Sequence, residues 1–271
     1  MKASVIQMVS TNDTDQNIAT ASRLLREAKN QGATLAVLPE MFAHFGEKDA
    51  YAFAKDWTQP DGAIRTWLSS IAKEQALWIV AGTLPIVDSE TQEKPTATSL
   101  ILDDQGNEVN RYDKIHLFDV DVKDQQGAYR ESNFYKKGSR TCVTSSPLGC
   151  IGLSVCYDLR FPELYRNLAQ RGAKLVTVPS AFTYQTGSAH WKPLLQARAI
   201  ENQCYVLAAN QGGQHSPKRQ TWGHSCIIDP WGKVLGEIET GEGVVTCDID
   251  LEEIESVRAS IPCLKHRQDW L

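Results

Sequence analysis

Three residues with reactive side chains each come directly after a segment that is predicted to be a strand. Glu40 follows TLAVLP, Lys114 follows EVNRYD and Cys156 follows IGLSV. Because α/β sheets place reactive groups at the ends of their strands, these side chains can converge on one site. A thiol nucleophile, a carboxylate base and an ammonium that stabilises an oxyanion are the groups that cysteine-dependent amide hydrolysis requires.

Each of the three residues also has an ordinary structural explanation. Cysteine is often a small buried side chain, a glutamate after proline can cap the next turn, and a lysine leaving a hairpin is usually solvated. The segment CYDLRFPEL favours chemistry at Cys156, because a thiol at a strand-to-helix turn lies near backbone N–H groups that favour a thiolate. A papain-like site would need a histidine partner, and none of the six histidines lies in a recognisable cysteine-protease motif.

The elements expected to position these residues alternate between strands and helices in each half of the chain. Hydrophobic periodicity and helix-stop signals such as Gly32 and Gly172 define them. The expected strands and helices lie at 3–9, 14–31 and 34–40 in the first half, and at 151–158, 161–172, 174–180, 189–202 and 203–210 in the second. A further strand is expected at 78–86. Two hairpins are also expected, one formed by 98–104 with 108–114 and the other by 225–230 with 233–239.

Each half is therefore expected to build its own composite sheet, with helices on the outer face. No linker or low-complexity tract separates the halves, so residues 1–271 are predicted to form a single domain in which the two sheets pack together.

Composition argues against several classes of partner. The net charge is −5 and neither sign forms a block, so nucleic acid and anionic membranes are not expected partners. The N-terminus turns polar too early for a signal peptide, and no apolar run approaches the ~20 residues that span a bilayer. Seven cysteines without a C-x-x-C pair indicate neither a disulfide framework nor a zinc site, which favours a cytoplasmic protein. Neither a metal nor an organic cofactor is expected, since phosphate-binding glycine motifs are absent.

Three separated motifs resemble those of the nitrilase, or carbon-nitrogen hydrolase, superfamily. They are LPE at 38–40, YDKIHLFD at 112–119 and SVCYDLRFPEL at 154–164, and the resemblance covers essentially the whole chain. It implies an α/β fold, a four-layer αββα sandwich of two mixed sheets with helices on both outer faces. It also implies a Glu40–Lys114–Cys156 triad, and a second glutamate of the family's sites maps onto Glu131. A surface glutamate in a polar loop, 118–138, remains the alternative for Glu131. The family also implies a homodimer.

The expected reaction proceeds through a thioester. Glu40 takes the thiol proton, the Cys156 thiolate attacks an amide carbonyl, and Lys114 with the backbone N–H of Tyr157 holds the oxyanion. Phe182 is expected to line the pocket for the acyl chain, although a core role is equally compatible with its position after a strand.

Within the superfamily, residues 179–232 most resemble the branch that hydrolyses deaminated glutathione to 2-oxoglutarate and cysteinylglycine. The features are PSAF, ARAIENQCYV and the basic insert GQHSPKR, although Trp222 departs from the tyrosine found in some members of that branch. Lys218 or Arg219 of the insert can recognise the carboxylate of a dipeptide leaving group, or simply solvate a turn.

Three alternatives stay open. An ω-amidase acting on 2-oxoglutaramate shares AHW, WGHS and PWG with this chain. A nitrile hydrolase would use the same thiol, and a catalytically idle binding protein would use the sandwich only as a surface.

Overall fold

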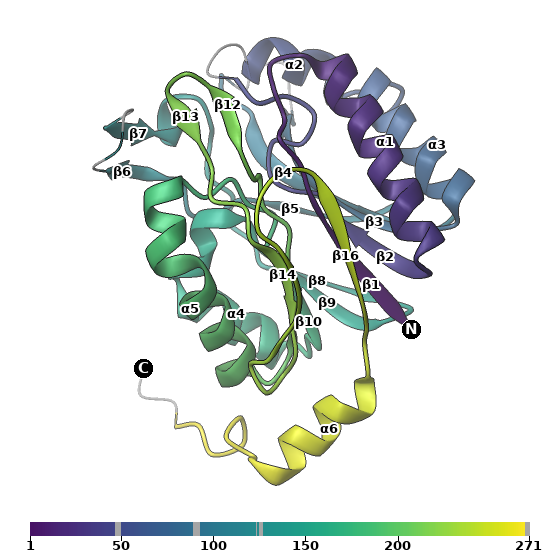
Figure 1. Ribbon diagram of the computed structural model, residues 1–271, viewed down its shortest axis with the longest axis vertical. Coiled ribbons are helices and arrows are strands. Elements are labelled where there is room, and N and C mark those ends of the chain that lie inside the picture. The colour runs from purple at the N-terminus through teal and green to yellow at the C-terminus, as the bar shows by residue number, and fades with distance from the viewer. Residues whose placement is uncertain (47–49, 89–92, 123, 125–126, 269–271) are drawn as a thin grey trace.

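The computed structural model describes residues 1–46, 50–88, 93–122, 124 and 127–268. Two six-stranded mixed sheets face each other, with strand orders β16-β1-β2-β3-β4-β5 and β15-β14-β11-β10-β9-β8. Each sheet has three parallel strands at its centre and antiparallel strands outside them. Helices α1 and α3 cover the first sheet, and α4 and α5 cover the second (Figure 1). The expected four-layer αββα sandwich is confirmed.

The elements have the following bounds. The first sheet contains β16 (Gly243–Asp248), β1 (Lys2–Gln7), β2 (Ala33–Val37), β3 (Trp78–Ile86), β4 (Thr96–Leu102) and β5 (Glu108–Asp113). The second contains β15 (Val234–Ile238), β14 (Ser225–Ile228), β11 (Tyr205–Ala208), β10 (Leu175–Thr177), β9 (Gly149–Leu153) and β8 (Cys142–Ser146). The helices are α1 (Thr14–Asn30), α2 (Ala50–Trp57), α3 (Ala63–Gln75), α4 (Pro162–Gln170), α5 (Tyr184–Asn202) and α6 (Leu251–Ser260), with 3-10 turns η1 (Glu131–Asn133) and η2 (Cys156–Arg160).

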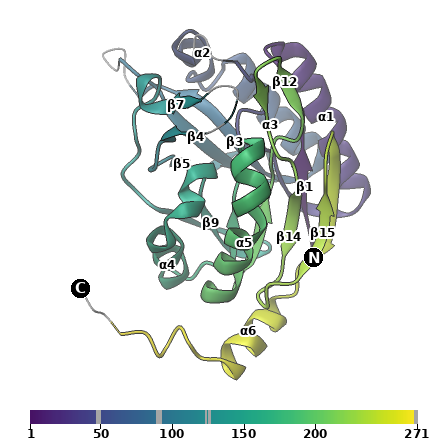
Figure 2. The same ribbon diagram turned by 60° about the vertical axis from the view of Figure 1, so that its left-hand side comes forward.

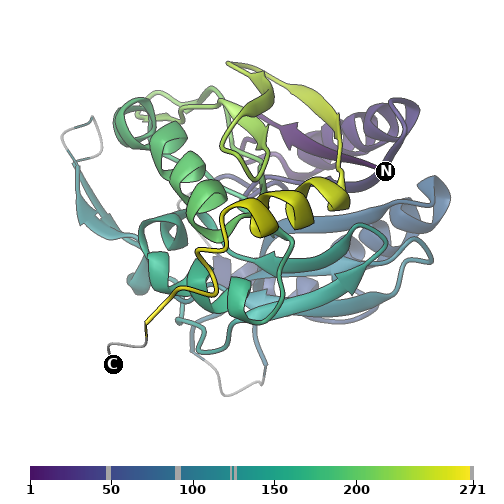
Figure 3. The same ribbon diagram turned by 90° about the horizontal axis from the view of Figure 1, so that it is seen from below.

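Two short ribbons stand outside the sheets. They are β6 (Asp119–Asp121) with β7 (Ala128–Arg130), and β12 (Gln214–Ser216) with β13 (Arg219–Gln220). Both lie at the end of the sandwich opposite α6 (Figures 1 and 2). Helix α6 lies across the other end, as seen from below in Figure 3, and residues 261–268 lead away from it.

The alternation of side chains in β1 explains why the first sheet is buried on both faces. Val5 is fully buried in the core between the two sheets, whereas Ile6 is fully buried in the core under α1 and α3. Successive strand residues point to opposite faces, so a continuous apolar run is what such a strand needs. Helix α1 then packs Leu24 and Leu25 onto the sheet, and the Asp13 side chain caps its first turn by accepting from the backbone N–H of Gln16 at 3.0 Å.

The expected strand–helix order is confirmed, with three differences. Helix α5 begins at Tyr184, five residues before the expected start, because the Thr183 side chain caps it there. Helices α2 and α3 lie in a region where no helix was expected. The expectation that each half builds its own sheet is wrong at one edge, because β16 from the C-terminal part pairs antiparallel with β1. No described helix is both long and apolar enough to span a bilayer.

Candidate active site

Glu40 lies three residues beyond β2, and a tight turn holds it. Gly82 makes the turn possible, because its φ is +29° and a Cβ there would lie 1.9 Å from the carbonyl oxygen of Pro39. Met41 also has a positive φ, 58°, and its backbone N–H donates to Thr83 Oγ1 at 3.0 Å. The Glu40 residue is only 5% exposed, so the fold fixes a carboxylate in a dry position.

Gln211 holds the Glu40 backbone from the second half of the chain. Its Nε2 donates to the Glu40 carbonyl at 3.0 Å and to Ser10 Oγ at 2.9 Å, while its Oε1 accepts from the Ser10 backbone N–H at 3.0 Å. Gln211 is fully buried. The sequence analysis did not find this residue, since QGGQH carries no signal of a contact with a segment about 170 residues earlier.

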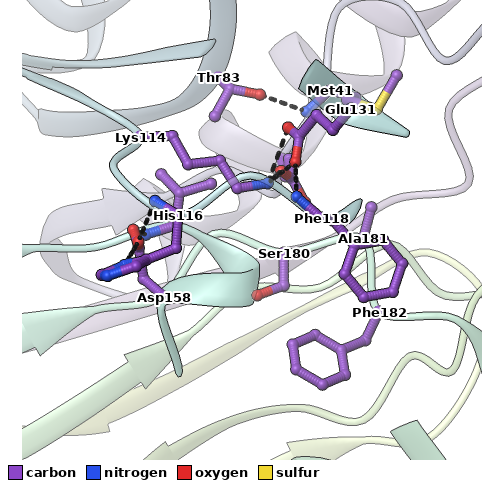
Figure 4. Close-up of polar contacts among 12 residues, drawn as sticks. Met41, Thr83, Lys114, His116, Phe118, Glu131, Asp158, Ser180, Ala181 and Phe182 are labelled. Carbon is purple, nitrogen blue, oxygen red and sulfur yellow. Dashed lines mark hydrogen bonds and ion pairs between the residues drawn. The ribbon is translucent and has the colours of Figure 1, made fainter. Parts of the chain in front are cut away.

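Lys114 leaves β5 and points into the interior, with only 1% of the residue exposed. Its Nζ donates to Glu40 Oε1 at 2.8 Å and to both carboxylate oxygens of Glu131 at 2.9 Å (Figure 4). The backbone N–H of Phe118 also donates to Glu131 Oε2, at 2.7 Å. Glu131 opens η1, directly after the β6–β7 ribbon, so the segment expected to be a polar loop is partly regular. The structure therefore brings Glu40, Lys114 and Glu131 together.

The charges of this cluster depend on one another. Burial by itself lowers the pKa of the Lys114 ammonium, but Glu131 and Glu40 raise the pKa well above its usual range. Burial raises the pKa of Glu131, which the charge of Lys114 offsets only in part, and Glu40 raises it further. The ammonium consequently keeps its charge in a buried position.

Cys156 opens η2 and faces the same cluster. Its φ is +49°, a left-handed conformation that is rare for a non-glycine residue, and its backbone N–H donates to the Pro179 carbonyl at 2.9 Å. The Glu40 carboxylate and the backbone N–H of Ala181 lie close enough to the Cys156 thiol to shift its pKa, the carboxylate upward and the N–H downward. Figure 4 shows Ala181 beside Phe182, on the side of the site away from Thr83.

The surroundings of Cys156 favour the neutral thiol over the thiolate. Burial raises its pKa well above the usual range, the Glu40 carboxylate raises it further, and Lys114 lowers it by less. A backbone N–H lowers the pKa as expected for this turn, but burial and Glu40 outweigh it. The five-residue η2 is too short to outweigh desolvation and a neighbouring negative charge.

Asp158 joins the lysine segment to the cysteine turn. It is fully buried, and its Oδ2 accepts from the Tyr112 hydroxyl and from the Val155 backbone N–H, both at 2.8 Å. Its Oδ1 accepts from the backbone N–H of His116 at 3.2 Å and contacts His116 Nδ1 at 2.7 Å. The sequence analysis quoted Asp158 within CYD without a role, because the contacts with His116 and Tyr112 cross two sheets.

Tyr157 and Phe182 both lie near one guanidinium. The Arg160 Cζ is 5.9 Å from the Tyr157 ring centroid and 5.5 Å from that of Phe182. Tyr157 is the second residue of η2, so its N–H belongs to the first turn, where amides have no helical partner. Phe182 is 4% exposed and packs on Trp191, with ring centroids 4.8 Å apart, so it also has the expected alternative role in the core.

Arg219 lies in β13 and reaches the same site from the ribbon. Its Nη2 donates to the Ala181 carbonyl at 3.3 Å, and its Cζ is 4.7 Å from the Tyr129 ring centroid. Lys218 is exposed. Within the described ranges, no three or more His, Cys, Asp or Glu side chains are grouped so that they could hold a metal ion.

Comparisons with known proteins agree on one family. The profile described as carbon-nitrogen hydrolase matches residues 2–259. The deaminated glutathione amidase of Yersinia enterocolitica is 39% identical over 264 residues, which are 97% of this chain and 92% of that protein. The human deaminated glutathione amidase is 42% identical over 97% of this chain and 81% of its own length. The crystal structure of the Caenorhabditis elegans NitFhit protein superimposes with a TM-score of 0.91 at 37% identity, covering 98% of this chain and 65% of that longer one.

Proposed function

The chain belongs to the carbon-nitrogen hydrolase family and is an amidase, and from this premise we propose that it hydrolyses deaminated glutathione to 2-oxoglutarate and cysteinylglycine. The observation that carries the chemistry is the buried group of Glu40, Lys114 and Glu131 around the thiol of Cys156. The substrate rests on the relatives, which are named for that activity at about 40% identity over nearly the whole chain.

The reaction proceeds in two half-reactions. Glu40 accepts the proton of the neutral thiol as Cys156 attacks the amide carbonyl, and the oxyanion is held by Lys114 and the backbone N–H of Tyr157. The carbon–nitrogen bond then breaks, Glu40 passes its proton to the leaving nitrogen, and an acyl thioester remains on the sulfur. Water attacks the thioester, Glu40 takes its proton, and the carboxylic acid leaves as the thiol is restored.

The electrostatics of the site support these roles. A neutral thiol beside a carboxylate is the correct starting state for a base that must take a proton during attack. Lys114 keeps its charge because Glu131 pairs with it through both oxygens, which makes Glu131 a positioning residue for the ammonium. Removing water from the site strengthens the attraction between the ammonium and an oxyanion.

The closest alternative is an ω-amidase that acts on 2-oxoglutaramate. Both substrates carry the same 2-oxoglutaryl group, so the triad alone does not distinguish a dipeptide from ammonia as the leaving group. We favour the dipeptide because the curated relatives above are deaminated glutathione amidases.

The test is kcat/KM for deaminated glutathione and for 2-oxoglutaramate, with Cys156→Ala as the blank. A preference of about 100-fold for deaminated glutathione, or ~2.7 kcal/mol at the transition state, is the expected result. The reverse preference makes the protein an ω-amidase. Full turnover by Cys156→Ala refutes the thioester mechanism, and ammonia release from a nitrile in place of the amide supports a nitrile hydrolase.

We further propose that the protein is a homodimer and is cytoplasmic. A groove of about 430 Å³ between α5, the β14–β15 turn and the segment after α6 is lined by the exposed apolar side chains Ile200, Trp231 and Ile261. Exposed apolar patches of this kind support an interface. Sedimentation of the wild-type chain and of Trp231→Asp tests the dimer, since a dimer through this face dissociates in the variant. All seven cysteines are free thiols, which supports a reducing compartment; fractionation of cells tests it.

A further inference from the structure

Arg219 connects the two ribbons at the end of the sandwich. Its guanidinium carbon lies 4.7 Å from the Tyr129 ring centroid, in β7, and 5.7 Å from the Phe45 ring centroid, in the segment that follows Glu40. Both ribbons stand at the end of the sandwich away from α6 (Figure 1). A guanidinium stacked between aromatic rings is held in one orientation, so its N–H groups point in fixed directions.

One end of the Arg219 guanidinium has no partner. Nη2 donates to the Ala181 carbonyl at 3.3 Å, but Nη1 is buried and makes no hydrogen bond within the described part of the chain. Buried polar groups are nearly always hydrogen-bonded, and leaving a charged donor unsatisfied is unfavourable. The fold therefore maintains a cationic donor that an anionic ligand can complete.

This free donor lies next to the nucleophile. The Ala181 carbonyl oxygen accepts from Arg219, and the backbone N–H of the same residue lowers the pKa of the Cys156 thiol, so Ala181 lies between the guanidinium and the nucleophile. Tyr129, beneath the guanidinium, is two residues from Glu131. Arg219 thus contacts a residue beside the nucleophile and a residue close in the chain to Glu131.

A second guanidinium lies near the cysteine turn. The Arg160 Cζ is 5.9 Å from the Tyr157 ring centroid and 5.5 Å from that of Phe182. In the proposed mechanism Glu40 gives its proton to the leaving nitrogen, so the leaving group must extend toward the Glu40 side. The two rings that contact Arg219 belong to segments next to the carboxylates in the chain, Phe45 five residues after Glu40 and Tyr129 two residues before Glu131.

We propose that Arg219 selects the leaving group by binding the carboxylate at its far end, which makes a peptide with a free C-terminus the leaving group that this site prefers. This inference rests on the proposed function. Two parallel N–H groups of a guanidinium match the two oxygens of a carboxylate, and Nη1 supplies a donor that no protein group uses. Ammonia, the leaving group of 2-oxoglutaramate, offers nothing to this arginine.

The experiment compares Arg219→Gln with Lys218→Gln, a matched control on the exposed neighbouring residue of the same ribbon. Each variant is assayed with deaminated glutathione, with its analogue in which the glycine carboxylate is a primary amide, and with 2-oxoglutaramate. For wild type, kcat/KM is expected to fall by roughly 100-fold from the carboxylate to the amide analogue. Arg219→Gln is expected to lose roughly 100-fold on deaminated glutathione alone, and to change the other two substrates by less than about threefold. Lys218→Gln retains the wild-type pattern.

Several results overturn the inference. If Arg219→Gln loses kcat/KM equally on all three substrates, the arginine only supports the ribbon. If it loses kcat/KM equally on deaminated glutathione and on its amide analogue, the arginine does not recognise the carboxylate. If Arg219→Gln does not fold, as judged by circular dichroism, the wild-type comparison of the carboxylate and amide substrates decides, since equal kcat/KM values refute carboxylate recognition. Wild-type turnover of neither deaminated glutathione nor 2-oxoglutaramate refutes the proposed function instead.

Discussion

Replacing Asp158 with asparagine tests whether the lysine segment and the cysteine turn are held together through this one carboxylate. Four donors surround it: the Tyr112 hydroxyl at 2.8 Å, the Val155 N–H at 2.8 Å, and the backbone N–H and Nδ1 of His116 at 3.2 and 2.7 Å. A carboxylate accepts on both oxygens, whereas an amide of the same shape accepts on one and donates from the other. In Asp158→Asn the amide NH₂ therefore faces two groups that donated to the carboxylate, so donors meet donors on that side.

The magnitude follows from the least unfavourable orientation of the amide. If its NH₂ group faces His116, the ring can present an unprotonated Nδ1 as acceptor, and only the backbone N–H of His116 loses its partner. A buried donor without a partner costs about 1–3 kcal/mol, and the remaining bonds lose the strength that the negative charge gave them. We expect the free energy of unfolding to fall by about 3 kcal/mol.

Activity should fall as well, because Asp158 holds two short segments in register. His116 lies two residues after Lys114, and Val155 lies directly before Cys156. Loosening the carboxylate lets the ammonium and the sulfur move apart, so kcat is expected to fall by about 10- to 100-fold while KM changes little.

Urea unfolding and steady-state kinetics on 2-oxoglutaramate measure both effects. The control is Tyr112→Phe, which leaves the carboxylate in place but removes one of its donors and the oxygen that accepts from the Ile115 N–H at 3.3 Å; it should cost about 1–2 kcal/mol. An Asp158→Asn protein within about 0.5 kcal/mol of wild type, or no less active than Tyr112→Phe, would refute the bracing role.

Three further predictions address the site and its surroundings. Gly82→Ala places a Cβ against the Pro39 carbonyl, so the turn that carries Glu40 must shift. We expect the free energy of unfolding in urea to fall by about 2 kcal/mol and kcat to fall about tenfold. Wild-type values for both would show that this turn does not need a glycine. Lys114→Met leaves the Glu40 and Glu131 carboxylates without their cation, so the free energy of unfolding at pH 7 should fall by about 3–5 kcal/mol. The loss should be smaller at pH 5, where the folded variant takes up a proton that the unfolded chain does not. An equal loss at both pH values argues against the pairing with Glu131. Burial lowers the pKa of His215 from 6.5 to about 4, so below pH 6.5 the unfolded chain binds a proton that the folded protein does not bind. Between pH 7 and pH 5 the free energy of unfolding should therefore fall by about 2 kcal/mol more in wild type than in His215→Gln. Urea unfolding measures this, and parallel pH profiles of the two proteins would exclude it.

Local patterns in the sequence were enough to predict most strands and helices and the positions of the reactive residues. Apolar runs define β1, β2 and β9, and a helix of period 3.6 with a glycine stop defines α1, because these signals depend on neighbours a few residues apart. The positions of Glu40, Lys114 and Cys156 after strands follow from the same signals. The four-layer sandwich came from resemblance to a family, since strand periodicity alone does not say how two sheets pack.

Long-range contacts decided the edge of the first sheet and the polar contacts that hold the site. The sequence does not say that β16 completes the first sheet, because pairing with β1 joins segments about 240 residues apart through backbone hydrogen bonds that carry no side-chain signature. Gln211 and Asp158 are ordinary polar residues until the fold buries them among donors and acceptors.

The protonation state of the nucleophile shows the difference most directly. The residues around Cys156 in the sequence favour a thiolate, whereas the folded site keeps a neutral thiol, because burial removes water and brings Glu40 to the sulfur. The sequence by itself determined which groups are proposed to do the chemistry. Their charges, and the free donor on Arg219 beside them, exist only in the tertiary structure, because desolvation and hydrogen bonding depend on residues that are distant along the chain.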